Sequence, residues 1–208
     1  MQAGKRGSQW RWFYPGLWML ALGLALGAQG SYPLPKEAKA LMPGSATDIS
    51  GTWAAMATSV HGKISAAVKG KTACDEATSS GTVAIEAHGS TMSHLLKMYE
   101  AAQQEEIRKK AAEAGQPPEE ALGYTYVGPM KDETLPAGRI FYRELGKPCI
   151  ESGTDQGRTE TSLTGYARKG SFFFKFTINA PMRAADAKAL AGEILANIQK
   201  VDLPLGAQ

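Results

Sequence analysis

The chain has 208 residues, with 23 Lys and Arg side chains against 20 Asp and Glu, and a formal net charge of +3 at pH 7. The whole surplus comes from Lys5, Arg6 and Arg11, because no acidic residue occurs before Glu37. A nucleic-acid-binding domain needs a basic surplus to neutralise phosphates. The balanced charge of the remaining chain excludes that class, so we expect no nucleic-acid partner.

The first 30 residues have the layout of a secretory signal peptide. Their strongly apolar stretch, Leu17–Ala28, is about 12 residues long. A membrane-spanning helix needs about 20 residues, whereas the hydrophobic part of a signal peptide needs about 7–15. Ala28 and Gly30 supply small residues before a cleavage site. The pattern predicts that residues 1–30 are removed and that the mature protein is periplasmic or secreted.

An uncleaved inner-membrane anchor is the alternative interpretation of the same leader. Trp10, Trp12, Phe13 and Tyr14 can form an aromatic belt at a membrane interface. In that case the chain contacts the membrane only through its leader.

The N-terminal third carries mixed signals. Residues 31–50 are rich in Pro and Gly and predict a flexible arm, with a helical turn around Lys36–Met42. A single α+β domain is then expected over residues 51–208. The segment from Trp53 to Val68 fits either a poor helix or a hairpin that turns at His61-Gly62.

Two cysteines, Cys74 and Cys149, remain after the leader. An even number of cysteines in an exported protein predicts a disulfide. Closing a loop of this length would stabilise the fold by about 4 kcal/mol in the chain-entropy model. Two buried thiols and a redox pair are the alternatives, although no C-x-x-C spacing is present.

A strand and a long helix follow. Thr82–His88 is rich in β-prone residues, and Ser90 or Thr91 can cap a helix that ends at Gly115. We expect an apolar inner stripe and an outer face with pairs of Glu and Lys four residues apart. The stripe consists of Met92, Leu95, Leu96, Tyr99, Ala102, Ile107 and Ala111, and the outer pairs are Glu105–Lys109 and Glu106–Lys110.

The segment YARKGSFFFKFTIN predicts an aromatic β-hairpin that turns at Lys169-Gly170. A two-residue turn at this point makes Gly165 face Phe174, whose ring then covers the backbone that the glycine leaves bare. In this register, the same face carries the pairs Ala167–Phe172, Leu163–Phe176 and Thr161–Ile178, and the other face carries Tyr166–Phe173, Thr164–Lys175 and Ser162–Thr177.

The chain ends in the most regular amphipathic pattern of the sequence. The stripe predicts a helix that packs on a sheet and stops before Pro204. The helical stripe consists of Ala187, Leu190, Ala191, Ile194, Leu195, Ile198 and Val201.

Upstream of the hairpin, Gly138–Leu145 is predicted to be a strand with Ile140 and Tyr142 on one side, and Tyr124–Val127 suggests another strand.

Together these elements predict an antiparallel sheet flanked by helices, an α/β/α sandwich that ends in the aromatic hairpin and the C-terminal helix. The segment ARKGSFFFKFTINAP leading into AKALAGEILANIQKV resembles the PsbP-like, DcrB-like family over about residues 82–201. The resemblance implies a non-enzymatic domain, because proteins of that fold mostly serve as assembly factors, accessory subunits or binding proteins. No motif residue matches, so no site residues are carried over.

Histidines and a carboxylate suggest one enzymatic alternative. Glu86 and His88 point the same way on a strand, and His94 opens the adjoining helix. Imidazole and carboxylate are zinc ligands, so these three side chains are a candidate metal site for a hydrolase. The spacing matches no known ligand motif, and surface or hydrogen-bonded histidines explain it as well. We therefore expect neither a cofactor nor a catalytic set.

The second candidate is the polar face of the terminal hairpin. Tyr166, Arg168, Phe173 and Lys175 combine aromatic and cationic groups. Left uncovered, this face can dock an envelope protein or a small anionic ligand; covered by a helix, Tyr166 and Phe173 belong to the core. The sequence thus favours an exported binding or accessory module of the bacterial envelope over a metal-dependent hydrolase or a purely structural component.

Overall fold

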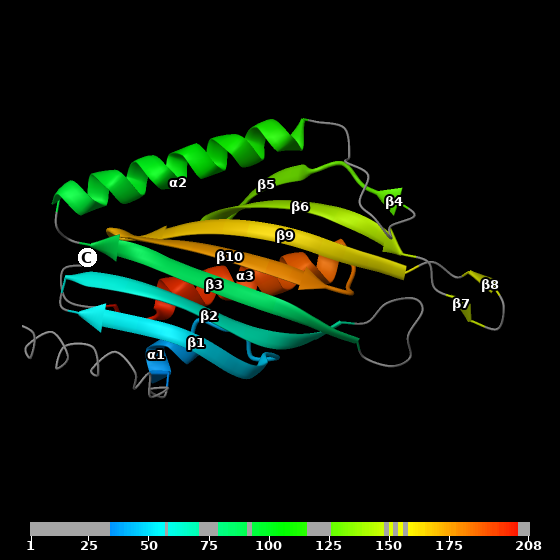
Figure 1. Cartoon of the computed structure of the whole chain (residues 1–208), viewed down its shortest axis with the longest axis horizontal. Coiled ribbons are helices and arrows are strands. Elements are labelled where there is room, and N and C mark those ends of the chain that lie inside the picture. Colours follow the sequence, from blue (N-terminus) through cyan, green and yellow to red (C-terminus); the bar gives the residue numbers. More distant parts are fainter. Residues whose placement is uncertain are drawn as a thin grey trace, which may run out of the picture. The chain divides into compact units, whose positions relative to one another are not determined.

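A computed structural model describes residues 34–56, 58–70, 79–90, 93–115, 126–147, 150–151, 154–155 and 158–203. These residues form an α+β fold around one open antiparallel sheet of eight strands, flanked by three helices (Figure 1). None of the described helices is long and apolar enough to cross a membrane. Residues 1–33 and both cysteines, Cys74 and Cys149, lie outside the described residues, so the signal peptide and the disulfide stay predictions.

The sheet has the strand order β1-β2-β3-β10-β9-β6-β4, and β5 also pairs with β6. The terminal hairpin therefore lies at the centre, with the N-terminal strands on one side and the middle of the chain on the other. The strands are β1 (Thr47–Met56), β2 (Ser59–Gly70), β3 (Ser79–Ser90), β4 (Tyr126–Val127), β5 (Lys131–Leu135), β6 (Gly138–Lys147), β9 (Arg158–Lys169) and β10 (Phe172–Ala180), beside a separate pair of β7 (Ile150–Glu151) and β8 (Thr154–Asp155).

Helix α3 (Ala184–Lys200) packs on one face of the sheet and forms the main core. Its predicted stripe is buried apart from Leu190, which is partly buried. The helix lies on the side chains of β10 that alternate inward. The core includes Phe172, Phe174, Phe176 and Ile178 of β10, Val83 and Ile85 of β3, and Ala187, Ala191, Ile194, Leu195 and Ile198 of α3, each fully or almost fully buried.

The N-terminal arm is the first correction. Residues 34–50 do not hang free, because α1 (Lys36–Lys39) and the turn after it bury Ala38 and Leu41 completely. The Asn197 side-chain amide donates to the Met42 carbonyl at 3.0 Å, which ties this segment to α3. Ala38, Leu41 and Met42 are therefore core residues, and β1 begins already at Thr47.

The ambiguous segment is a β-hairpin, but its turn does not lie at His61-Gly62. Met56 pairs with Ser59, so the chain reverses between them, and Gly62 pairs with Trp53 inside the sheet. A side chain at Gly62 would collide with the Trp53 ring. The glycine therefore makes room for an aromatic ring and does not mark a turn.

The terminal hairpin has the predicted faces and a different register. Lys169 pairs with Phe172, so the turn is Gly170-Ser171 and every partner moves by two residues. Gly165 faces Phe176 in place of Phe174, and that ring covers its backbone. Gly170 has φ = 58°, a left-handed conformation that suits the first central position of a tight hairpin turn.

Helix α2 (Ser93–Ala114) covers the opposite face of the sheet, across β3, β10, β6 and β5 (Figure 1). It has the predicted length, yet none of its residues is buried. Ala102 of the predicted inner stripe is exposed, whereas Glu106, expected on the outer face, points to the sheet and pairs with Lys175. On the outer side, Glu105 pairs with Arg108 and not with Lys109.

Candidate functional site

The four residues singled out on the polar face of the hairpin lie together beneath α2. Tyr166 and Arg168 of β9 pair with Lys175 and Phe173 of β10, so all four project from the same face of the sheet. The helical cover makes Tyr166 and Phe173 core residues. They are only 3% and 4% exposed.

An aromatic row forms the apolar part of this face. Phe141 of β6 joins Tyr166 and Phe173, and it is 1% exposed. The rings of Phe141 and Tyr166 meet edge to face, with centroids 6.2 Å apart. The Arg168 guanidinium stacks over the Phe173 ring at 5.3 Å, which adds a cation–π contact.

Two ion pairs connect α2 to this row. Arg168 Nη1 lies 2.8 Å from Oε1 of Glu100, and Lys175 Nζ lies 2.6 Å from Oε1 of Glu106. All four side chains are between about a quarter and a half exposed. Water and salt therefore reach both pairs and weaken them.

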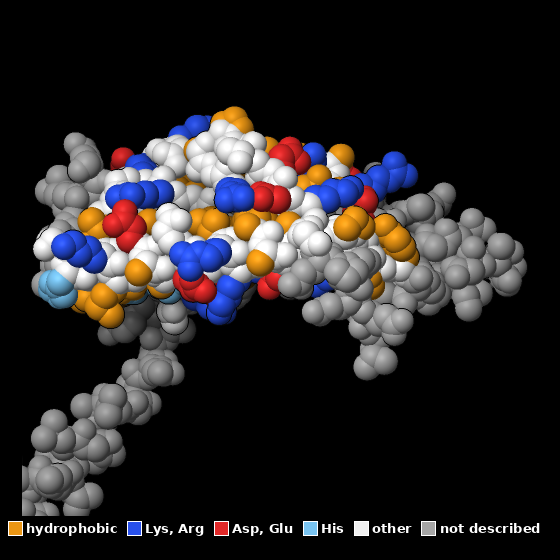
Figure 2. Space-filling view, turned by 90° about the horizontal axis from the view of Figure 1, so that it is seen from above, with side chains coloured by type: hydrophobic (Ala, Val, Ile, Leu, Met, Phe, Trp, Pro, Cys, Tyr) orange, Lys and Arg blue, Asp and Glu red, His pale blue; other side chains and the backbone are white. Residues whose placement is uncertain are grey.

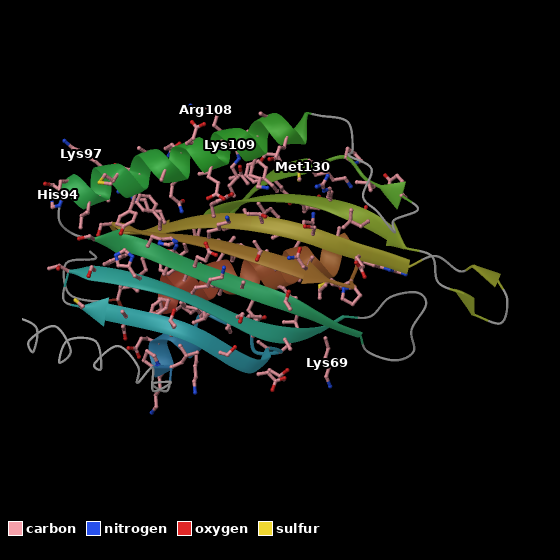
Figure 3. All side chains as sticks on the ribbon, viewed as in Figure 1. Lys69, His94, Lys97, Arg108, Lys109 and Met130 are labelled. Carbon is pink, nitrogen blue, oxygen red and sulfur yellow. The ribbon has the colours of Figure 1, made fainter. Side chains whose placement is uncertain are left out.

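The sheet-facing stripe of α2 is half polar. Its residues are only partly buried, in agreement with a helix that lies on the sheet without interlocking with it. The stripe consists of Leu95, Leu96, Tyr99, Glu100, Gln103, Glu106, Ile107, Lys110, Ala111 and Ala114. On the other side of α2, Lys97 and Arg108 extend away from the sheet (Figure 3).

The Tyr166 hydroxyl is buried and makes no hydrogen bond with the described residues. Burial raises the pKa of the phenol well above its usual range, and the negative charge of Glu106 raises the pKa further. The Glu106 carboxylate thus lies close enough to raise the pKa of the phenol, and the charge of Glu113 raises that pKa as well. Tyr166 is therefore a neutral, protonated group at neutral pH.

At its N-terminal end, α2 meets a cluster of rings. His61 and His88 are cross-strand partners on β2 and β3, with ring centroids 6.2 Å apart. The Tyr99 hydroxyl hydrogen-bonds to Nε2 of His61 at 3.0 Å, and its ring stacks on His88 at 6.1 Å. Neither His61 nor Tyr99 belonged to the predicted site.

Charged neighbours complete this cluster. Lys63 Nζ lies 2.9 Å from Glu86 Oε1, and this hydrogen bond lowers the pKa of Glu86 against the opposing effect of burial. Burial lowers the pKa of His88, while Glu86 raises it and His61 and Lys175 lower it further. His88 is therefore a neutral imidazole at neutral pH. Its neighbours are the Glu86 carboxylate, the Lys175 ammonium and the His61 imidazole.

The predicted metal site does not come together. Glu86 Oε2 lies 4.0 Å from His88 Nε2, but His94 is exposed at the N-terminal end of α2 (Figure 3). Across the described ranges, no three His, Cys, Asp or Glu side chains are placed to hold a metal ion. His94 cannot join Glu86 and His88 as a metal ligand, because it lies on the exposed side of α2, away from the strand that carries them.

A hollow lies on the α3 side of the sheet, next to α1 and the end of α3. It encloses about 620 Å³ and mixes apolar with charged side chains. Its floor includes Trp53, whose indole nitrogen is buried without a hydrogen-bond partner in the described chain. No local sequence pattern predicts this hollow, because its walls come from residues that are far apart along the chain.

The described side chains on the surface above the aromatic row mix positive with negative charges. Figure 2, which views the molecule from the α2 side, shows Lys and Arg side chains interspersed with Asp and Glu and with hydrophobic groups. Such a surface excludes strong steering of a highly charged polymer. Any recognition on this side must come from particular side chains.

The comparisons with known proteins found no matching family model, no similar curated protein and no similar solved structure.

Proposed function

We propose that this chain is an exported, non-enzymatic binding or accessory module of the bacterial envelope, and that it binds through the sheet face beneath α2. The observation that supports this proposal is the contrast between the two sides of that interface. A helix of 22 residues buries none of its own side chains, yet it covers three aromatic side chains that are almost fully buried.

The interaction energies favour replacement of α2 on this face by a partner. An exposed ion pair contributes about 0–1 kcal/mol, and salt screens it. Full burial of an aromatic side chain is worth about 1.5–3 kcal/mol. A partner that keeps Phe141, Tyr166 and Phe173 buried and packs apolar groups where the stripe of α2 has polar ones therefore gains more than α2 does.

The leader and the charge balance support the exported location. Intact-mass analysis of the native protein tests it, because a processed chain begins at Ser31. The same spectrum, taken with and without reductant, tests the disulfide between Cys74 and Cys149. A native chain that still begins at Met1, or two free thiols, would contradict this part of the proposal.

The binding face is tested with anilinonaphthalene sulfonate, an anionic aromatic dye. Glu100→Gln with Glu106→Gln removes both ion pairs between α2 and the sheet and leaves the aromatic row intact. We therefore expect the dye to bind this variant about tenfold more tightly than it binds the unmodified protein. The matched control is Glu105→Gln with Asp202→Asn, which changes the net charge equally at exposed positions outside the sheet-facing stripe of α2.

Hydrogen exchange provides the structural readout. We expect the α2 amides to exchange long before those of α3, and faster still in the Glu100/Glu106 variant. Equal dye affinity in both double variants, or exchange of α2 as slow as that of α3, would show that the face is permanently closed and would refute the proposed function.

A further inference from the structure

The two cations of the binding face, Arg168 and Lys175, are separated by a distance that can be compared with the geometry of a helix. Arg168 pairs with Phe173, and Lys175 lies two residues further along β10. Diagonal neighbours on adjacent strands are about 7–8 Å apart. Their partners Glu100 and Glu106 are six residues apart on α2, which corresponds to about 9 Å of helix rise. The face therefore pairs with two carboxylates that are six residues apart on a helix.

A small anion does not satisfy this arrangement. It can neutralise Arg168 and Lys175, but it leaves the aromatic row uncovered. The area that α2 occupies crosses four strands, β3, β10, β6 and β5. A rod about 33 Å long, the length of a 22-residue helix, covers it.

The face also matches α2 imperfectly. Gln103 and Lys110 of α2 lie on the sheet-facing stripe, where an apolar residue would bury more surface. Ile107 is the one large aliphatic side chain in the second half of that stripe. A helix with the same two carboxylates and apolar residues at these two positions would bind this face better than α2 does.

We infer that the partner of this module presents an acidic amphipathic helix, which takes the place of α2. Its pattern is a carboxylate at position i, apolar residues at i+3, i+7 and i+10, and a second carboxylate at i+6. The carboxylates pair with Arg168 and Lys175, and the apolar residues pack on Phe141, Tyr166 and Phe173. This inference rests on the proposed function, because it names the partner of the same face.

The test uses a fluorescent peptide with the sequence of residues 93–114 carrying Gln103→Leu and Lys110→Leu. The receptor is the full chain with Glu100→Gln and Glu106→Gln, because a tethered α2 competes at a high effective concentration. We expect anisotropy to give a Kd at least tenfold lower for this peptide than for the same peptide that also carries Glu100→Gln and Glu106→Gln. At high salt this difference should fall to less than threefold.

Two further receptors locate the contact. Arg168→Gln with Lys175→Gln, added to the receptor, should abolish the preference for the acidic peptide. Lys97→Gln with Lys109→Gln removes the same charge from exposed positions on α2 and should preserve the preference. Equal binding of the acidic and neutral peptides, or equal loss in both receptors, would overturn the inference.

The dye experiment separates the two proposals. If the dye binds the opened face but the acidic peptide does not, the binding face stands and the helical partner is wrong. If neither binds, the proposed function fails together with the inference.

Discussion

The Tyr99 hydroxyl lies 3.0 Å from Nε2 of His61, which links the first turns of α2 to β2 across the sheet. His88 lies beside both rings and is a neutral imidazole at neutral pH, because burial lowers its pKa. Glu86 and Glu106 oppose this effect, and Lys175 and His61 support it. The attachment of α2 therefore depends on the charge of a histidine.

The first prediction concerns pH. A histidine in the unfolded chain has a pKa of about 6.5. Since the pKa of His88 in the folded chain is lower, the contribution of His88 to stability is complete above pH 6.5 or so and is lost as the pH falls through that value towards the folded pKa. We expect hydrogen exchange of α2 to accelerate between about pH 7.5 and 5.5 relative to α3.

His88→Gln is the control for this experiment, because an uncharged amide of similar size removes the titration. The variant should flatten the pH dependence of α2 exchange and leave that of α3 as it was. If the unmodified and variant proteins lose α2 protection in parallel on acidification, His88 is not the responsible group.

The second prediction concerns Tyr166. Its buried hydroxyl has no hydrogen bond within the described residues, and an unsatisfied buried polar group costs about 1–3 kcal/mol. Tyr166→Phe should therefore raise the free energy of unfolding by about 1 kcal/mol in urea denaturation. Tyr142→Phe is the comparison, because the Tyr142 hydroxyl donates to Glu133 at 3.4 Å, and it should be neutral or destabilising.

A loss of stability in Tyr166→Phe would mean that the hydroxyl has a partner in solution. The neighbouring Glu106 carboxylate is the nearest candidate, because its charge already acts on the phenol.

Local sequence patterns predict most of the fold. The terminal hairpin shows their limit, because they predict its faces but not its register. The alternation of Phe172, Phe174 and Phe176 with polar residues determines which face each side chain takes. A shift of two residues leaves all those faces unchanged, so the pattern cannot distinguish the two registers. The backbone of Gly170, with φ = 58°, determines the turn instead.

The candidate site was predictable in part for a related reason. The sequence placed Tyr166, Arg168, Phe173 and Lys175 on one face because that face follows from strand alternation alone. The ion pairs with α2 join residues almost 70 positions apart, and no local pattern encodes them. The half-polar stripe of α2 was the available signal, since a helix packed into a core would carry fewer charges there.

The third prediction compares two glycines. Gly165→Ala places a methyl group against the Phe176 ring in the main core, and overpacking of this kind costs about 1–3 kcal/mol. Gly192→Ala adds a methyl group to the exposed side of α3 with nothing within 4 Å, and it should stabilise the protein by about 0.5–1 kcal/mol. Urea denaturation of both variants measures the two opposite shifts.

Equal effects of the two substitutions would contradict the structure of the hairpin. In the register expected from the sequence, Gly165 faces Phe174 instead, so the double variant Gly165→Ala with Phe176→Leu identifies the partner. It should lose less stability than the sum of the losses in the two single variants, because the smaller side chain at position 176 leaves room for the methyl group.

The last prediction concerns the end of α3. The Lys169 ammonium donates to the carbonyl of Gln199 at 2.9 Å and also to the carbonyl of Val201, so it caps the C-terminus of the helix. Lys169→Met keeps most of the aliphatic side chain and removes both hydrogen bonds, so we expect a loss of about 1–2 kcal/mol in the free energy of unfolding. Lys200→Met removes an exposed cation from the same turn and should change stability by less than about 0.5 kcal/mol. If the two variants are equally stable, the cap contributes nothing and α3 is held by its buried stripe alone.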